Sequence, residues 1–233
     1  ADPRFQGAAP AFGPESLDIP WALRPDEKLS ASDVKDLLAT TYDGTEYDPY
    51  GTKGTPETRH QYRYVGIDRT SECSVLCIRP NVPVALRSVH WFAPASGPFN
   101  TAVAMYANVT TMPAYLDTPT AVTTDSLYWN NRLVAGLADP QFFESYEPIQ
   151  GYRLNTMAQG YQMLHETDAK LMALAKEGTM NLDAMDDAAV QAELAAANQA
   201  LADSVQAQTR SLLGTVLDQR TVAMKNAFNM NDH

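Results

Sequence analysis

Arg69 stands near two acidic residues, Asp68 and Glu72, at the junction between two strand-like segments. A guanidinium at a strand end can hold a carboxylate through two parallel hydrogen bonds. The neighbouring carboxylates could equally neutralise the same charge within the chain. The residue types therefore leave two interpretations open, a binding group for a substrate carboxylate and a structural ion pair.

Two cysteines, Cys73 and Cys77, follow on what reads as one strand. Four strand residues span about 13 Å, whereas a disulfide needs Cα atoms within about 7 Å of each other. Two ligands also fall short of the four that a structural zinc site takes. A catalytic thiol would need an activating neighbour, which Glu72 and Ser74 do not supply. We expect both cysteines to be small core residues, in a reducing compartment.

Other patterns with recognisable chemistry are missing from the sequence. The 12 glycines form no phosphate-binding loop, and there is neither an HExxH metal motif nor a Gly-x-Ser-x-Gly serine motif. His90 lies between apolar residues, which is typical of a structural histidine. Asp183, Asp186 and Asp187 precede a helical stretch, where the helix dipole favours carboxylates. No cofactor and no metal are expected.

Composition narrows the classes of protein further. The chain has 233 residues, 45% hydrophobic and 19% charged, enough for one or two globular domains. Its net charge of −11 argues against a nucleic-acid partner, because such a surface repels phosphates. No apolar run approaches the roughly 20 residues of a membrane-spanning helix, so no membrane partner is expected. A start at Ala1, without Met or a signal sequence, indicates a processed or partial product, and the cytoplasm is the expected location.

The prolines divide the chain into two regions. All 15 lie at or before Pro148, and proline is costly inside helices. We therefore predict an antiparallel-sheet portion with one early helix over residues 1–150, and a long helical hairpin over residues 151–233. In the early helix, Ser30 and Asp33 can form a capping box. Val34, Leu37 and Leu38 form its apolar stripe.

Four strands are predicted after this helix. They span residues 60–69, 73–79, 86–93 and 101–106. The connections are too short for parallel crossovers, so we expect an antiparallel meander. Both faces of the second strand are mostly apolar, and we expect both to be covered. One face carries Cys73, Val75 and Cys77, and the other carries Ser74, Leu76 and Ile78.

Three helices are predicted in the rest of the chain, over residues 128–137, 152–176 and 190–216. Gly178 is the expected C-cap of the second. Two long amphipathic helices joined by a short loop should form an antiparallel hairpin. Packing of this hairpin on the sheet of the same chain is favoured, with a homo-oligomer as the alternative.

Several short motifs follow one another in a specific order. They are residues 29–34, Tyr47-Asp48-Pro49-Tyr50-Gly51, Ile67-Asp68-Arg69-Thr70, Ile78-Arg79-Pro80, Trp91-Phe92-Ala93, residues 106–110, Ser126-Leu127-Tyr128-Trp129 and Asp139-Pro140. As a set, over roughly residues 17–148, they resemble the C-terminal part of the cysteine dipeptidases of peptidase family C69.

This resemblance implies a thiol-dependent N-terminal-nucleophile hydrolase, whose full fold is a four-layer αββα sandwich. In that family a cysteine at the mature N-terminus attacks the peptide carbonyl, and its own α-amine, which titrates near neutrality, serves as the base. Position 1 is Ala1 here, so the half with the nucleophile is expected to be missing and the chain to be inactive alone. Arg69 resembles an arginine that related amidases place facing the nucleophile, to orient charge near the thiolate or to hold a substrate carboxylate.

Two functions follow from these observations. The first is the C-terminal portion of a cysteine dipeptidase, with a dipeptide as substrate and the missing N-terminal half of the same protein as partner. The alternative is a non-catalytic binding or assembly module built from a sheet and a helical hairpin.

Overall fold

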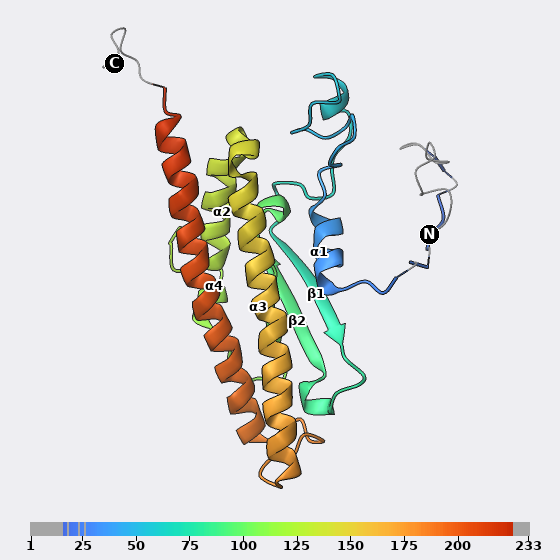
Figure 1. Cartoon of the computed structure of the whole chain (residues 1–233), viewed down its shortest axis with the longest axis vertical. Coiled ribbons are helices and arrows are strands. Elements are labelled where there is room, and N and C mark those ends of the chain that lie inside the picture. The colour runs from blue at the N-terminus through green and yellow to red at the C-terminus, as the bar shows by residue number, and fades with distance from the viewer. Residues whose placement is uncertain (1–15, 18, 23, 26, 226–233) are drawn as a thin grey trace.

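The computed structural model describes residues 16–17, 19–22, 24–25 and 27–225, so Ala1 lies outside the described residues. The described residues form an α+β fold in which helices pack against a small antiparallel sheet (Figure 1). Two long helices run side by side, and in this view β1 lies between α3 and the short helix α1. The α+β class expected from the sequence is confirmed.

Three antiparallel strands form the sheet in the order β1-β2-β3. They are β1, Glu72–Ile78, β2, Ser88–Pro94, and β3, Val103–Tyr106. Trp91 lies opposite Val75 on β1 and opposite Ala104 on β3. Its indole is 2% exposed, and its ring centroid lies 4.6 Å from that of Tyr161 on α3. These side chains form the core between the sheet and the helices.

The first predicted strand, over residues 60–69, is wrong. A 3-10 turn at Thr58–His60 is followed by further turns instead of a strand. The Gly66 backbone N–H donates to the Thr40 carbonyl at 2.9 Å, and a Cβ on Gly66 would lie 2.3 Å from the Ala39 carbonyl oxygen. This close approach to the end of α1 takes the segment away from the sheet.

The prediction that β1 is covered on both faces is also wrong for this chain. Cys73, Val75 and Cys77 pack against the core. On the opposite face, Leu76 is 76% exposed and Ile78 is 67% exposed. The strand therefore has one packed face and one open apolar face.

The two edges of the sheet differ. On the β3 side, the buried side chain of Asn198 on α4 accepts from the Tyr106 N–H at 2.9 Å and donates to the Tyr106 carbonyl at 3.0 Å. This pair of hydrogen bonds takes the place of a further strand. At the other edge, β1 has a strand neighbour on one side alone within the described chain.

Helix α1, Ala31–Ala39, has the predicted capping box between Ser30 and Asp33. Its predicted apolar stripe faces the wrong way, however. Ala31, Lys35 and Ala39 are buried, whereas Leu37 is 59% exposed and Leu38 is 42% exposed. Both sets of residues recur at helical spacing. The small alanines form the inner face because they let the helix approach the sheet closely.

The remaining helices are α2, Leu127–Ala138, α3, Phe142–Lys176, and α4, Ala188–Val222. The predicted antiparallel hairpin is formed by α3 and α4, which also contact β3. Gly178, with φ of +76°, follows α3 at the predicted position. Helix α3 runs through Pro148 and across residue 150, where we placed the domain boundary, and the division into two domains stays a prediction. No helix in the described ranges is apolar over a length that could cross a bilayer.

Candidate active site

The turn that carries Arg69 leads directly into β1. A hydrogen bond from the Thr70 N–H to the Ile67 carbonyl closes this turn at 3.1 Å. Arg69 is exposed, and its guanidinium has no ion pair or hydrogen bond with the part of the chain that the structure describes. The structural ion pair with Asp68 or Glu72, which the sequence left open, is therefore not formed. The catalytic role of this arginine stays a prediction.

A strained corner lies beside the start of β1. Ala95, directly after β2, has φ of +70°, a conformation that costs a non-glycine residue about 1–3 kcal/mol. Its N–H donates to the Ser71 carbonyl at 2.8 Å. The buried Asn100 amide donates to the carbonyls of Pro94 and Ala95, and the buried Asn131 amide donates to that of Pro94. Sequence reasoning missed this corner, because no pattern marks an alanine that will adopt a positive φ.

Three polar side chains form a line on the open face of the sheet. Ser74 Oγ donates to Glu72 Oε1, and His90 Nε2 lies 2.8 Å from Ser74 Oγ. Because the single hydroxyl proton points to the carboxylate, His90 donates through Nε2, and its Nδ1 is left as an acceptor. Burial lowers the pKa of His90, and Glu72 acts in the opposite direction. The imidazole is therefore neutral near pH 7 and aligned by its partners.

The two cysteines lie on the opposite, packed face of β1. Both are free thiols, half-buried against the helices. Burial raises the pKa of each thiol, while Lys35 acts in the opposite direction on Cys73 and Arg79 does so on Cys77. A raised pKa keeps a thiol protonated at neutral pH, and the thiolate is the nucleophilic form. These cysteines therefore have the environment of core residues.

Lys35 is a buried charge that sequence reasoning overlooked. It is 1% exposed, and its Nζ donates to the Gly97 carbonyl at 2.9 Å. Burial, together with the nearby guanidinium of Arg153, lowers the pKa of Lys35 to about 7. The available signal was its spacing from Ala31 and Ala39, four residues away on either side, which places it on the same helix face.

Asp187, one of the acidic residues before α4, has the structural role that its position indicated. Asp187 Oδ1 accepts from the N–H groups of Ala189 and Val190, at 2.9 and 3.2 Å, and so caps the helix. Among the residues with described positions, no three His, Cys, Asp or Glu side chains are grouped to hold a metal ion.

Comparison with known proteins gives the family. The profile of peptidase family C69 matches residues 4–155. The chain belongs to peptidase family C69. The resemblance noted over residues 17–148 is thereby confirmed.

Curated relatives align with nearly all of this C69 chain. A dipeptidase from Bifidobacterium longum is 39% identical over 94% of the chain and 46% of its own length. A probable dipeptidase A from Streptococcus pyogenes is 38% identical over 94% of the chain and 44% of its length. Dipeptidase A from Lactobacillus helveticus is 31% identical over 99% of the chain and 45% of its length. The chain thus spans less than half the length of these relatives.

Proposed function

We propose that this C69 chain is the C-terminal portion of a cysteine dipeptidase, and that a further half of the same protein supplies the nucleophilic cysteine. The relatives that align with it are named dipeptidases, and each is more than twice the aligned length. The observation that carries the proposal is the open apolar face of β1, where Leu76 and Ile78 are exposed beside the free strand edge.

A further feature supports a missing half on this side of the molecule. The outer face of α1 exposes Leu37 and Leu38, so the helical layer also ends in apolar surface. Exposed apolar surface of this kind marks an interaction site. A second sheet on the open face of β1 and β2 would complete the αββα sandwich of an N-terminal-nucleophile hydrolase. Strands added to the free edge of β1 would widen the first sheet.

In this proposal Arg69 faces the active site from the start of β1. Its guanidinium is exposed and unpaired in the described structure, so it can hold the carboxylate of a dipeptide or orient the thiolate. Glu72, Ser74 and His90 lie on the same open face, under the second sheet. Hydrolysis by a thiol and a cytoplasmic location belong to the same proposal, and the free Cys73 and Cys77 are compatible with a reducing compartment.

Dipeptide hydrolysis by the full-length protein, compared with the 233-residue chain, tests this function. We expect thiol-dependent turnover by the full-length protein and none by the chain alone. In the full-length protein, Arg69→Ala should lower kcat/KM about 100-fold, the loss typical of a charge-stabilising group. Arg63→Ala is the matched control, because Arg63 is also exposed and its guanidinium also has no partner in the described structure.

The opposite results would contradict the proposal in separate ways. Turnover by the 233-residue chain, abolished by Cys73→Ala or Cys77→Ala, would place the nucleophile in this portion. An unaffected Arg69→Ala enzyme would remove the arginine from the site. Absence of hydrolysis by the full-length protein would favour the non-catalytic assembly module.

A further inference from the structure

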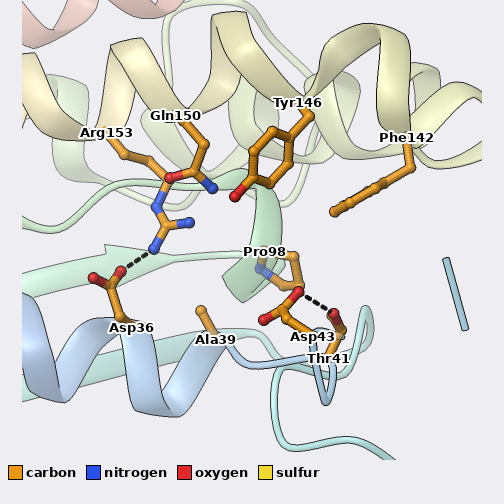
Figure 2. Close-up of a pocket in the computed structure, with 9 residues that line it drawn as sticks. All are labelled: Asp36, Ala39, Thr41, Asp43, Pro98, Phe142, Tyr146, Gln150 and Arg153. Atoms are coloured by element: carbon orange, nitrogen blue, oxygen red, sulfur yellow. Dashed lines mark hydrogen bonds and ion pairs between the residues drawn. The ribbon is translucent and has the colours of Figure 1, made fainter. Parts of the chain in front are cut away.

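A cavity of about 200 Å³ lies between α1 with its following loop and the first half of α3. Figure 2 shows Tyr146, Gln150 and Arg153 reaching into it from α3, toward Asp36 and Asp43 on the opposite side. Its volume equals that of about seven water molecules in the liquid and is smaller than the roughly 300–1,000 Å³ of pockets for drug-sized ligands. Only a small ligand fits it.

One end of the cavity offers hydrogen-bond donors. Arg153 is 8% exposed, and one of its Nη groups donates to Asp36. The other N–H groups of this guanidinium, and the amide of Gln150, have no partner among the described residues. These donors lie at the cavity, where a ligand can reach them. A ligand carboxylate at this end would satisfy them and form charge-assisted hydrogen bonds.

The other end offers a carboxylate. Asp43 Oδ1 accepts from Thr41 Oγ1 at 2.9 Å, which holds the side chain in place (Figure 2). Its second oxygen is bonded to nothing in the described ranges, and the residue is exposed. An ammonium group is the natural partner of such an oxygen. The apolar side chains of Ala39 and Pro98 line the wall between the two ends, and Phe142 lies at the Asp43 end (Figure 2).

We propose that this cavity binds a free α-amino acid, with its carboxylate at Arg153 and Gln150 and its ammonium at Asp43. The charges favour a zwitterion, because the carboxylates of Asp36 and Asp43 repel an anion and the guanidinium repels a cation. The choice of an amino acid among zwitterions rests on the proposed function, since hydrolysis of a dipeptide releases two amino acids. The apolar wall suits an aliphatic side chain.

Calorimetric titration of the 233-residue chain with L-leucine tests the proposal. We expect saturable binding with a Kd of about 1 mM or below. N-acetyl-leucine lacks the ammonium and leucinamide lacks the carboxylate, and each should bind at least about tenfold more weakly, the usual loss for a charged hydrogen bond. Leucyl-leucine should also bind more weakly, because it is larger than the cavity.

Asp43→Asn is the informative variant. The amide oxygen can still accept from Thr41, so the local fold should be kept while the charge is lost. Leucine affinity should fall about tenfold, whereas the affinity for N-acetyl-leucine, an anion that the Asp43 carboxylate repels, should not fall. Asp186→Asn is the matched control, since Asp186 is an exposed carboxylate in the connection between α3 and α4, away from the cavity. Circular dichroism melting confirms that both variants are folded.

Three results would overturn the assignment. They are the absence of saturable leucine binding, equal binding of leucine and N-acetyl-leucine, and an Asp43→Asn variant that binds leucine as the parent does. Tighter binding of leucyl-leucine would reassign the cavity to dipeptides. Because titration needs no turnover, failure of this inference is distinguishable from failure of peptide hydrolysis by the full-length protein.

Discussion

The side-chain amine of Lys35 is buried in the folded protein. Because this amine loses its proton at a lower pH in the folded state than in the unfolded state, the free energy of unfolding depends on pH. Burial and the nearby Arg153 lower the pKa of the folded amine to about 7, although Cys73 and Asp36 act in the opposite direction. An unfolded lysine keeps its proton up to about pH 10.4. Between these two values unfolding takes up a proton, so the contribution of Lys35 to the free energy of unfolding rises with pH.

Lys35→Met should remove this dependence. Below pH 7 the folded parent protein holds a buried charge, and above pH 7 that charge is released. The free energy of unfolding of the parent minus that of the variant should therefore increase by about 2–3 kcal/mol from pH 6 to pH 9. Urea unfolding at the two pH values measures this difference.

Lys53→Met is the matched control, because Lys53 is exposed. The free energy of unfolding of the parent minus that of Lys53→Met should be the same at pH 6 and pH 9. A Lys35→Met difference that is also independent of pH would mean that the folded amine titrates like a solvated lysine.

At the residue scale, the sequence predicted local contacts and missed distant ones. The capping box of Ser30 and Asp33 and the cap at Asp187 were predictable, since each joins groups within three residues. The burial of Lys35 and the positive φ of Ala95 depend on segments far away in sequence. The same holds for the unpaired Arg69, whose neighbours in sequence suggested ion pairs that do not form.

At the element scale, α3 continues through a proline because α4 supplies the missing hydrogen bond. Pro148 has no N–H to donate to the Glu144 carbonyl four residues earlier. Gln219 on α4 donates to that carbonyl through Nε2 at 2.9 Å, and its Oε1 accepts from Ser145 Oγ at 3.1 Å. The glutamine thus satisfies the carbonyl that the proline leaves free.

Gln219→Ala should lower the free energy of unfolding by about 0.5–1.5 kcal/mol, the net value of a typical intramolecular hydrogen bond. In a Pro148→Ala background the helix can make its own bond to the Glu144 carbonyl. In that background Gln219→Ala should lower the free energy of unfolding by about 0.5–1 kcal/mol less than it does in the parent protein. A double-mutant cycle measured by urea unfolding gives this difference.

Gln206→Ala on α4 is the control for this cycle, because the Gln206 side chain has no hydrogen bond in the described structure. It should have little effect in either background. Equal costs of Gln219→Ala with and without Pro148 would show that the glutamine does not compensate for the proline.

The sequence predicted most elements but not all of their limits. Periodicity predicted the hairpin and three strands, because these patterns report the face that an element buries. Proline was treated as a helix boundary, so α3 was expected to begin near residue 152 rather than at Phe142. The segment 60–69 was predicted to be a strand. Its actual conformation depends on contacts with the end of α1, and no local sequence pattern indicates these contacts.

At the scale of the whole molecule, the wrong predictions about β1 and α1 have one cause. The spacing of apolar residues indicates that one face of an element is buried, but it does not indicate which part of the protein covers that face. The faces with Leu76 and Ile78 and with Leu37 and Leu38 are exposed in this chain. Both lie where the proposed second half of the protein would pack, and under that proposal the longer protein would bury them.

The open face of β1 should also make the isolated 233-residue chain self-associate. An exposed apolar strand at a sheet edge pairs readily with a second copy, and charged side chains prevent this. Sedimentation velocity should therefore show a mass that rises with concentration for the parent chain and stays near that of a monomer for Leu76→Lys. Leu217→Lys, at a 51% exposed position on α4, is the control for the hairpin. Loss of association in the Leu217 variant alone would instead support the homo-oligomer through the hairpin, and would leave the open face of β1 without a role in self-association.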